Sequence, residues 1–450
     1  MLRSFFYLFV ISAVLLLFGC GDGNDDPAVN VTSEATGILD ITFDDDGIVT
    51  YDSTAGSDQG RAIALDGFGN IIVAGTTENN TIMNIWKYSG TGALDGTFGT
   101  GGLVTDDSAA GGAGFDVGNG MAVDGSGNIF VTGYSLNAAG NVDMVIWKYD
   151  SSGVLDGTFG VGGVVIDHNA AGGDGQDSGN AIAIDGMGDI YITGKSFGNP
   201  TGDDMAIWKY NSSGTLDGTF GIGGIVTYHR VGGDSGNAIA LDGAGNIYVS
   251  GHSGNASNDL DMAIWKYDSN GVSDATFGTA GVVFDDTSTG NYEVGNSLRL
   301  DGSGNIFVTG YSDFTPGGAG DMALWKYDSS GTPDMTFGLG GYVIDNGAAG
   351  GNSYDNGIDI TLDGSGNLFV VGYSYNASNV ADMAIWKYDS NGDLDATFGI
   401  GGVVIDDGAA GGTGFDAAYA SMLDSLGNLF TTGTSSNVAG NPDMVIWKYE

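Results

Sequence analysis

One tripeptide, Trp-Lys-Tyr, recurs along the whole chain and constrains the fold more than any other feature. It accounts for every tryptophan of the protein, and successive copies lie 61, 61, 57, 60, 61 and 61 residues apart. A period this regular indicates a repeat architecture in which each copy is one supersecondary unit. The seven tryptophans are Trp86, Trp147, Trp208, Trp265, Trp325, Trp386 and Trp447.

A single repeat contains four short apolar segments separated by glycine-rich turns. In the copy over residues 180–228 these segments are 180–185, 189–194, 204–210 and 224–228. Glycine makes up 84 of the 450 residues, and it supplies the positive φ angles that tight turns require. The third segment is apolar on both faces, as in a strand covered by neighbours on both sides. Four short antiparallel strands per repeat are typical of a β-propeller blade.

The phase of the repeat predicts how the ring closes. The first copy is incomplete, since residues 39–43 and 47–51 match only the end of a repeat, and the chain stops at Glu450, after a third segment. The count reaches seven complete units only if residues 47–51 form the outer strand of the last one. We therefore predict an all-β fold, a seven-bladed β-propeller of four-stranded antiparallel blades over residues 38–450, closed by an N-terminal strand.

The repeat also resembles a known family. Its pattern is Leu-Asp-x-Thr-Phe-Gly-x-Gly-Gly-x-Val, then Asn-x-Ile-x-Val-x-Gly, then a strand ending in Lys-Tyr. This is similar to the bacterial delta-60 repeat, which is related to other seven-bladed propeller repeats, and the resemblance covers residues 39–450. It implies a propeller and an exported or surface location, and it implies no catalytic residues.

The N-terminal segment has the features of an export signal. Arg3 precedes an apolar run over residues 5–18, which is short for a membrane span and typical of a signal peptide. The sequence Leu17-Phe18-Gly19-Cys20 resembles a bacterial lipobox. We expect a signal peptide over 1–19, lipidation of Cys20 with a tether over 20–37, and an anchor in the bacterial cell envelope, in the outer membrane or at the cell surface. The alternative is an ordinary signal peptide or an uncleaved anchor.

The charge of the chain excludes one class of partner. Twelve basic residues face 56 acidic ones, which gives a formal net charge of −44. Nucleic-acid binding needs clustered Lys or Arg, so no nucleic-acid partner is expected. Strong self-repulsion also favours a monomer.

Aspartates recur at two positions of the repeat and form candidate cation sites. One series precedes the methionine of the third segment, and a second closes the fourth segment; both are expected at the long-loop face. Calcium takes clustered carboxylate oxygens, but a solvated acidic face without any cofactor is the favoured interpretation. The first series is Asp143, Asp204, Asp261, Asp321, Asp382 and Asp443, and the second is Asp106, Asp107, Asp167, Asp285, Asp286, Asp345, Asp406 and Asp407.

Two charged residues interrupt the small side chains of the first segments. Alanine and glycine dominate one face of these segments, but the fifth repeat has Arg299 and the sixth has Asp359. Either the two form an ion pair between adjacent blades, or they are polar groups that line the central channel.

Other motifs have structural explanations. The lysines of Trp-Lys-Tyr are expected to pair with nearby aspartates, the Asp-Gly-Ser-Gly-Asn segments to form tight turns, and His168, His229 and His252 to lie at the surface. No catalytic motif is recognisable. The expected function is a binding or scaffold module for a protein or glycan partner. The alternatives are a lyase or hydrolase that acts on carbohydrate at the long-loop face, for which a cluster of polar groups in an axial pocket would argue, and a calcium-stabilised structural protein.

Overall fold

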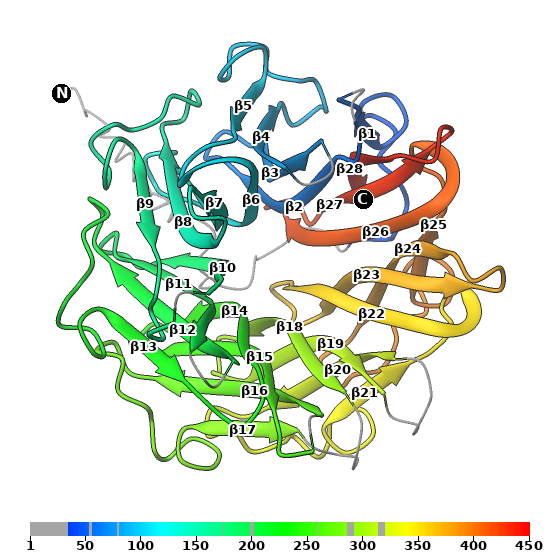
Figure 1. Cartoon of the computed structure of the whole chain (residues 1–450). Helices are drawn as coiled ribbons and strands as arrows, with labels where there is room; N and C mark the ends of the chain where they lie inside the picture. The colour runs from blue at the N-terminus through cyan, green and yellow to red at the C-terminus, as the bar shows by residue number, and fades with distance from the viewer. Residues whose placement is uncertain are drawn as a thin grey trace, which may run out of the picture.

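The computed structural model shows a ring of seven four-stranded sheets around a central axis (Figure 1). It describes residues 35–53, 56–78, 81–173, 175–198, 202–257, 259–285, 292–313 and 320–450. Every strand pair within a sheet is antiparallel, and each regular element in these ranges is a strand. The predicted all-β, seven-bladed propeller is therefore confirmed.

Each blade runs from an inner strand near the axis to an outer strand at the rim. Blades 1 to 3 are β2 (Gln59–Leu65), β3 (Ile71–Thr77), β4 (Ile82–Tyr88) and β5 (Leu103–Asp106); β6 (Gly111–Val123), β7 (Ile129–Asn137), β8 (Val142–Tyr149) and β9 (Val164–Asp167); and β10 (Asp177–Ile184), β11 (Ile190–Gly198), β12 (Gly202–Tyr210) and β13 (Ile225–Tyr228).

The same order continues through the next three blades. These are β14 (Asp234–Leu241), β15 (Ile247–Gly254), β16 (Leu260–Tyr267) and β17 (Val282–Asp285); β18 (Glu293–Leu300), β19 (Ile306–Ser312), β20 (Asp321–Tyr327) and β21 (Tyr342–Asp345); and β22 (Gly350–Leu362), β23 (Leu368–Asn376), β24 (Ala381–Tyr388) and β25 (Val403–Asp406).

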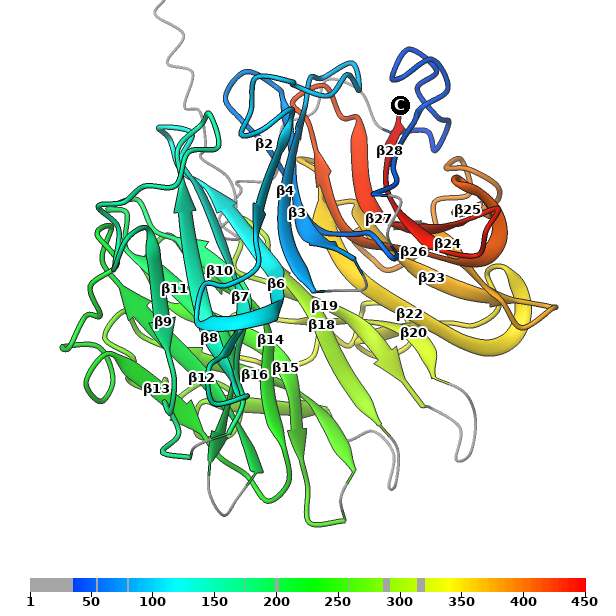
Figure 2. The same ribbon diagram turned by 45° about the horizontal axis from the view of Figure 1, so that its top comes forward.

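Blade 7 contains both ends of the propeller. It consists of β26 (Gly411–Leu423), β27 (Leu429–Asn437), β28 (Pro442–Tyr449) and, at the rim, β1 (Ile48–Tyr51). Ile48 pairs with Trp447 and Tyr51 with Met444, and β1 lies beside β28 in both views (Figures 1 and 2). The N-terminal strand thus closes the ring as the repeat phase predicts.

The hydrophobic core is divided among the interfaces between blades. The tryptophans are at most 2% exposed and pack with residues of the adjacent blade. Two indole groups also donate across the interface: Trp208 Nε1 lies 2.9 Å from Asp167 Oδ1, and Trp386 Nε1 lies 3.0 Å from Asp345 Oδ1. At these positions, aspartates that close the fourth strands join two blades.

The lysines of Trp-Lys-Tyr pair with aspartates, as the sequence predicts. The partner is usually the aspartate of the Leu-Asp-x-Thr-Phe pattern eight residues later, as in the 3.0 Å pair between Lys148 and Asp156. Lys448 has no such aspartate after it in the chain. Its partner is Asp40, at 2.8 Å, so the N-terminal segment completes the last repeat in its side chains as well as in its backbone.

The propeller begins slightly before the predicted boundary at residue 38. Ala35 is 3% exposed, and the Thr36 amide donates to Glu450 O at 2.6 Å. Residues 35–37 therefore pack on the propeller instead of belonging to a tether. The expected signal peptide and Cys20 lie outside the described residues. Within the described residues, no helix is long and apolar enough to cross a membrane.

Candidate functional site

An irregularity in each inner strand points one residue of every blade toward the axis. The pairing of the first two strands shifts by one residue after a small residue, for instance between Gly179 and Ala181. The extra residue of such a β-bulge is left out of the ladder. We call this residue the axial residue. The seven axial residues are Arg61, Asn119, Asn180, Asn237, Asn296, Ile358 and Tyr419.

Glycines allow the backbones to approach closely enough for this arrangement. A Cβ atom on Gly179 would lie 2.2 Å from Thr132 Oγ1 of blade 2, and one on Gly194 would lie 1.9 Å from Ser178 O. Both distances are too short for a side chain. The glycines beside the bulges are therefore required by the packing of inner strands around the axis.

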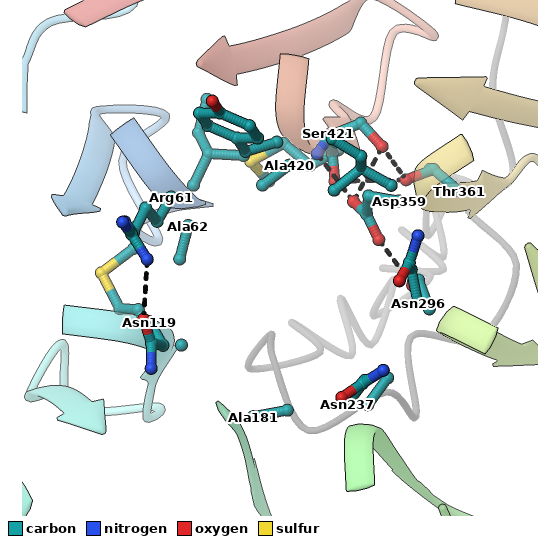
Figure 3. Close-up of a pocket in the computed structure, with 18 of the residues that line it drawn as sticks. Arg61, Ala62, Asn119, Ala181, Asn237, Asn296, Asp359, Thr361, Ala420 and Ser421 are labelled. Atoms are coloured by element: carbon teal, nitrogen blue, oxygen red, sulfur yellow. Dashed lines mark hydrogen bonds between the residues drawn. The ribbon is translucent and has the colours of Figure 1, made fainter. Parts of the chain in front are cut away.

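The axial residues surround a cavity of about 540 Å³ on the propeller axis. Its wall also includes Arg299, Asp359, Thr361 and Ser421 from blades 5 to 7. Figure 3 shows Arg61 and Asn119 on one side of the cavity, with Asp359, Thr361 and Ser421 on the other. The volume is in the range of small-molecule binding sites.

Four axial asparagines connect each blade to the next one. In each case the side-chain amide donates to the carbonyl oxygen of the small residue before the next bulge, at 2.9–3.0 Å; Asn180 bonds to Gly236 O in this way. Arg61 extends the series, because its Nη1 lies 3.0 Å from Asn119 Oδ1. These amides are mainly structural, since their donor groups already bond to protein.

The asparagine series is replaced by a different polar cluster in blades 5 to 7. Asp359 Oδ1 accepts from Ser297 Oγ at 2.7 Å and Oδ2 from the Ser421 amide at 2.8 Å, so one carboxylate joins three blades. Arg299 Nη2 lies 3.5 Å from Asp359 Oδ1, and Thr361 Oγ1 lies 2.9 Å from Ser421 Oγ. Arg299 and Asp359 thus both face the cavity and contact each other across adjacent blades.

The cavity is positively charged in a strongly acidic protein. It holds Arg61 and Arg299, two of the four arginines in the chain, against the carboxylate of Asp359. Tyr419 remains a neutral hydroxyl, because burial raises its pKa to about 12 although Arg61 acts to lower it. The arrangement suits hydrogen bonds to a polar ligand with negative charge.

The aspartates predicted as cation ligands lie away from this cavity and are not solvated. Asp143, Asp204, Asp261, Asp321, Asp382 and Asp443 are 1–7% exposed. They sit at the start of the third strand of their blades, near the end of the fourth, as the pairing of Met144 with Asp167 shows. Burial raises the pKa of Asp321 and Asp443 to about 6. The expectation of a solvated acidic face is therefore wrong for this series.

A third acidic series was missed in the sequence, although it is also repeated. One acidic residue of every inner strand region is at most 1% exposed: it stands at or just before the start of four inner strands and five residues after the first residue of the long strands β6, β22 and β26. Burial raises the pKa of Asp116 to about 7 and that of Asp416 to about 6. The recurrence at one repeat position could have revealed the series: Asp58, Asp116, Asp177, Asp234, Glu293, Asp355 and Asp416.

The histidines differ in their surroundings. His168 is exposed, and the His229 side chain is 40% exposed, as expected of surface residues. His252 differs from the expected surface residue, because it is partly buried and burial lowers its pKa to about 4. His229 Nδ1 lies 2.8 Å from Asp204 Oδ1.

Family models match several of the repeats. A model described as a beta-propeller repeat matches residues 110–138, and a beta-propeller domain of unknown function, DUF5122, matches residues 125–159, 302–337 and 364–398. The expectation of propeller repeats is confirmed by these matches. No curated protein matches the chain significantly.

Several solved structures match most of this chain, each at low identity and with a TM-score below 0.5. A PL25 polysaccharide lyase, an ulvan lyase, has 14% identity and a TM-score of 0.49, with 88% of this chain and 95% of that chain covered. The polysaccharide lyase Uly1 has 11% identity and a TM-score of 0.48, with 87% and 90% covered. A gluconolactonase from Xanthomonas campestris has 13% identity and a TM-score of 0.34, with 72% and 90% covered. Likeness of this degree indicates neither an activity nor a ligand.

Proposed function

We propose that this protein is a lipid-anchored binding module of the bacterial cell envelope that takes an anionic polar ligand, such as the acidic end of a glycan, into the axial cavity. The observation that carries the proposal is the placement of Arg61 and Arg299 in one cavity of a chain with net charge −44. Guanidinium groups bind carboxylates strongly, and the hydroxyl groups of Thr361, Tyr419 and Ser421 supply neutral hydrogen-bonding positions.

The polar groups of the cavity favour binding over catalysis. The cavity does contain the cluster of polar groups that argues for a lyase or hydrolase, but catalysis also needs a base that works near neutral pH. The described lining contains no histidine, and Asp359 already accepts hydrogen bonds from Ser297 and Ser421. The Tyr419 pKa of about 12 makes its phenolate scarce near neutrality. The arginines remain as the groups best suited to contact a ligand.

The anchoring part of the proposal rests on Cys20, and one substitution tests it. In Cys20→Ser the thiol that forms the acyl link is absent, so we expect the protein to move from the detergent phase to the aqueous phase on partitioning. The unchanged chain serves as the control. Retention of the variant in the detergent phase would show that the apolar segment, not a lipid, is the anchor.

The binding part is tested by titrating acidic oligosaccharides into the protein. With uronic-acid oligosaccharides as probes, we expect calorimetry to show binding that Arg61→Gln or Arg299→Gln weakens about 10- to 100-fold, because a lost charge-assisted hydrogen bond costs about 1.5–3 kcal/mol. The Asp359 carboxylate keeps its serine donors in the second variant, so the fold should persist.

Two controls sharpen this experiment. Lys195→Gln removes the same charge from a partly exposed ion pair with Asp203, and it should leave the affinity unchanged. Neutral oligosaccharides of the same length should bind much more weakly. Equal affinity for neutral and acidic probes, or arginine variants that bind as the unchanged protein does, would contradict the proposal.

A further inference from the structure

Three side chains of different strands converge at the interface between blades 3 and 4. They are Asp204 in β12, His229 directly after β13, and Asp234 at the start of β14. One potential ligand atom from each lies within 4.8 Å of the other two. This is the spacing expected of atoms that can share one metal ion, and none of the three residues lines the axial cavity.

Asp234 provides a second and independent indication of a ligand. Asp234 is 0% exposed, and its Oδ2 accepts a hydrogen bond from the backbone amide of Arg230, at 2.7 Å. Its Oδ1 is buried and makes no hydrogen bond of regular geometry in the part of the chain that the structure describes, although the neighbouring Ser253 hydroxyl is near enough to act to lower the Asp234 pKa. A buried carboxylate oxygen left without a partner costs free energy unless a cation or a proton satisfies it.

The neighbouring charges do not supply such a cation. Arg230 directs its guanidinium to Asp261 and the ring of Phe284, so of its groups only the backbone amide reaches Asp234. His229 Nδ1 lies 2.8 Å from Asp204 Oδ1, and in the tautomer with the ring proton on Nε2 this nitrogen is the one that could bind a metal. The site has two carboxylates and one imidazole, and it opens to solvent only on the His229 side.

The three positions recur in every repeat, but the residue at the position of His229 varies: it is His168 in one other repeat, Asn346 in another, and aspartate in the rest. In the interface that closes the ring, Asp443, Asp52 and Asp58 occupy the same places, and their ligand atoms also lie within 4.8 Å of one another. There the two Asp58 oxygens accept hydrogen bonds from Ser53, so that cluster is satisfied without an ion. The blade 3–4 interface differs from the closing one by its histidine and by the unpartnered oxygen of Asp234. The blade 2–3 interface also has a histidine, His168, and a buried oxygen without a partner, on Asp177, but among the described residues its three groups do not bring their ligand atoms within 4.8 Å of one another.

We propose that Asp204, His229 and Asp234 bind one divalent transition-metal ion that links blades 3 and 4. Imidazole with two carboxylates is a ligand set suited to Zn²⁺ or Mn²⁺, whereas Ca²⁺ and Mg²⁺ prefer sites built from oxygen alone. Three protein ligands leave a fourth position for water on the exposed side.

The test uses Zn²⁺ alone as the probe on the full-length protein, freed of metals by chelation. After dialysis, we expect elemental analysis to find one more Zn²⁺ per chain in the unchanged protein than in the Asp234→Asn variant. We also expect a saturable rise of about 3 °C in melting temperature at about a hundredfold excess over Kd, reversed by chelator. Ca²⁺ at matched ionic strength should give a smaller rise.

Variants separate this site from general effects of charge. Asp234→Asn is isosteric and removes a buried carboxylate, so the metal-free protein should fold and melt no earlier than the unchanged chain. His229→Gln changes a partly exposed ring and should lose the same ion. Asp45→Asn alters an exposed residue and should retain it. A Zn²⁺ content or melting rise that persists in both Asp234→Asn and His229→Gln would overturn the proposal, as would equal rises with Zn²⁺ and Ca²⁺.

Discussion

Deleting residues 38–52 is expected to lower the melting temperature by more than about 10 °C or to cause aggregation. The deletion removes β1, whose residues Ile48–Tyr51 pair with β28. It also removes Phe43 and Val49, which are 0% and 3% exposed and pack against blades 7 and 1. Burial of one such phenylalanine alone is worth about 3–5 kcal/mol. Calorimetry and light scattering on the purified protein measure the result.

The loss should be large because it leaves an open edge in a ring. Without β1, the strand β28 exposes unpaired backbone groups between apolar side chains, and exposed edges of this kind promote association between molecules. The deletion also removes Asp40, the ion-pair partner of Lys448, and it would displace the Thr36 amide that donates to Glu450 O.

A second deletion and a point variant serve as controls for closure. Removal of residues 21–34, which precede the described propeller, should leave the melting temperature unchanged. Phe43→Ala should lower it by about 3–5 °C, because the melting temperature of a chain this long shifts by about 1 °C for each kcal/mol lost from the free energy of unfolding. If the protein without residues 38–52 melts as the complete chain does, β1 does not close the ring in solution.

The protein is expected to be most stable in mildly acidic solution and to lose about 5–10 °C of melting temperature between about pH 5 and pH 8. Burial raises the pKa of Asp116 from 3.8 to about 7 and that of Asp416 from 3.8 to about 6. Shifts of this size correspond to roughly 3–4 kcal/mol each. Thermal scans across this pH range, with chelator present, measure the profile.

The sign follows from proton binding in the two states. Above about pH 3.8 both carboxyls still hold a proton in the folded protein and release it on unfolding, so the free energy of unfolding falls as pH rises from about 4 and levels off only above the folded pKa values of about 6 and 7. Other groups act in the opposite sense. Hydrogen bonds from Thr158 and Lys148 lower the pKa of Asp156 to about 2, so its contribution is lost only as pH falls from about 4 toward 2.

Self-repulsion at net charge −44 would also weaken the protein at higher pH, and a variant separates the two causes. In Asp116→Asn the buried group no longer titrates, so the pH profile of the variant should be flatter than that of the unchanged chain. This difference should persist at about 1 M NaCl, where the Debye length is about 3 Å and self-repulsion is screened. Asp45→Asn changes an exposed carboxylate and should leave the slope intact. A melting temperature that rises between about pH 5 and pH 8 would contradict the assignment.

The local pattern of the chain determines its architecture. The period of Trp-Lys-Tyr counts the blades, and the phase at residues 47–51 places the closing strand, because strand pairing within a blade is between neighbours in sequence. The same locality explains why the pairing of the Trp-Lys-Tyr lysines with nearby aspartates could be predicted, as in the pair between Lys148 and Asp156. Arg299 and Asp359 could be singled out because they interrupt a repeated pattern of small residues.

What the sequence could not decide is how residues of adjacent blades meet across the interfaces. Asp204, His229 and Asp234 belong to two blades, and their convergence depends on the rotation between those blades. The axial residues meet only because a bulge in each inner strand points them toward one axis, and the bulges follow from pairing register. The burial of acidic side chains also depends on how the blades pack against one another. The Asp143 series has the composition of a solvated face, but its carboxylates are 1–7% exposed in the folded protein, where neighbouring side chains donate to them, as the Asn137 amide does to Asp143.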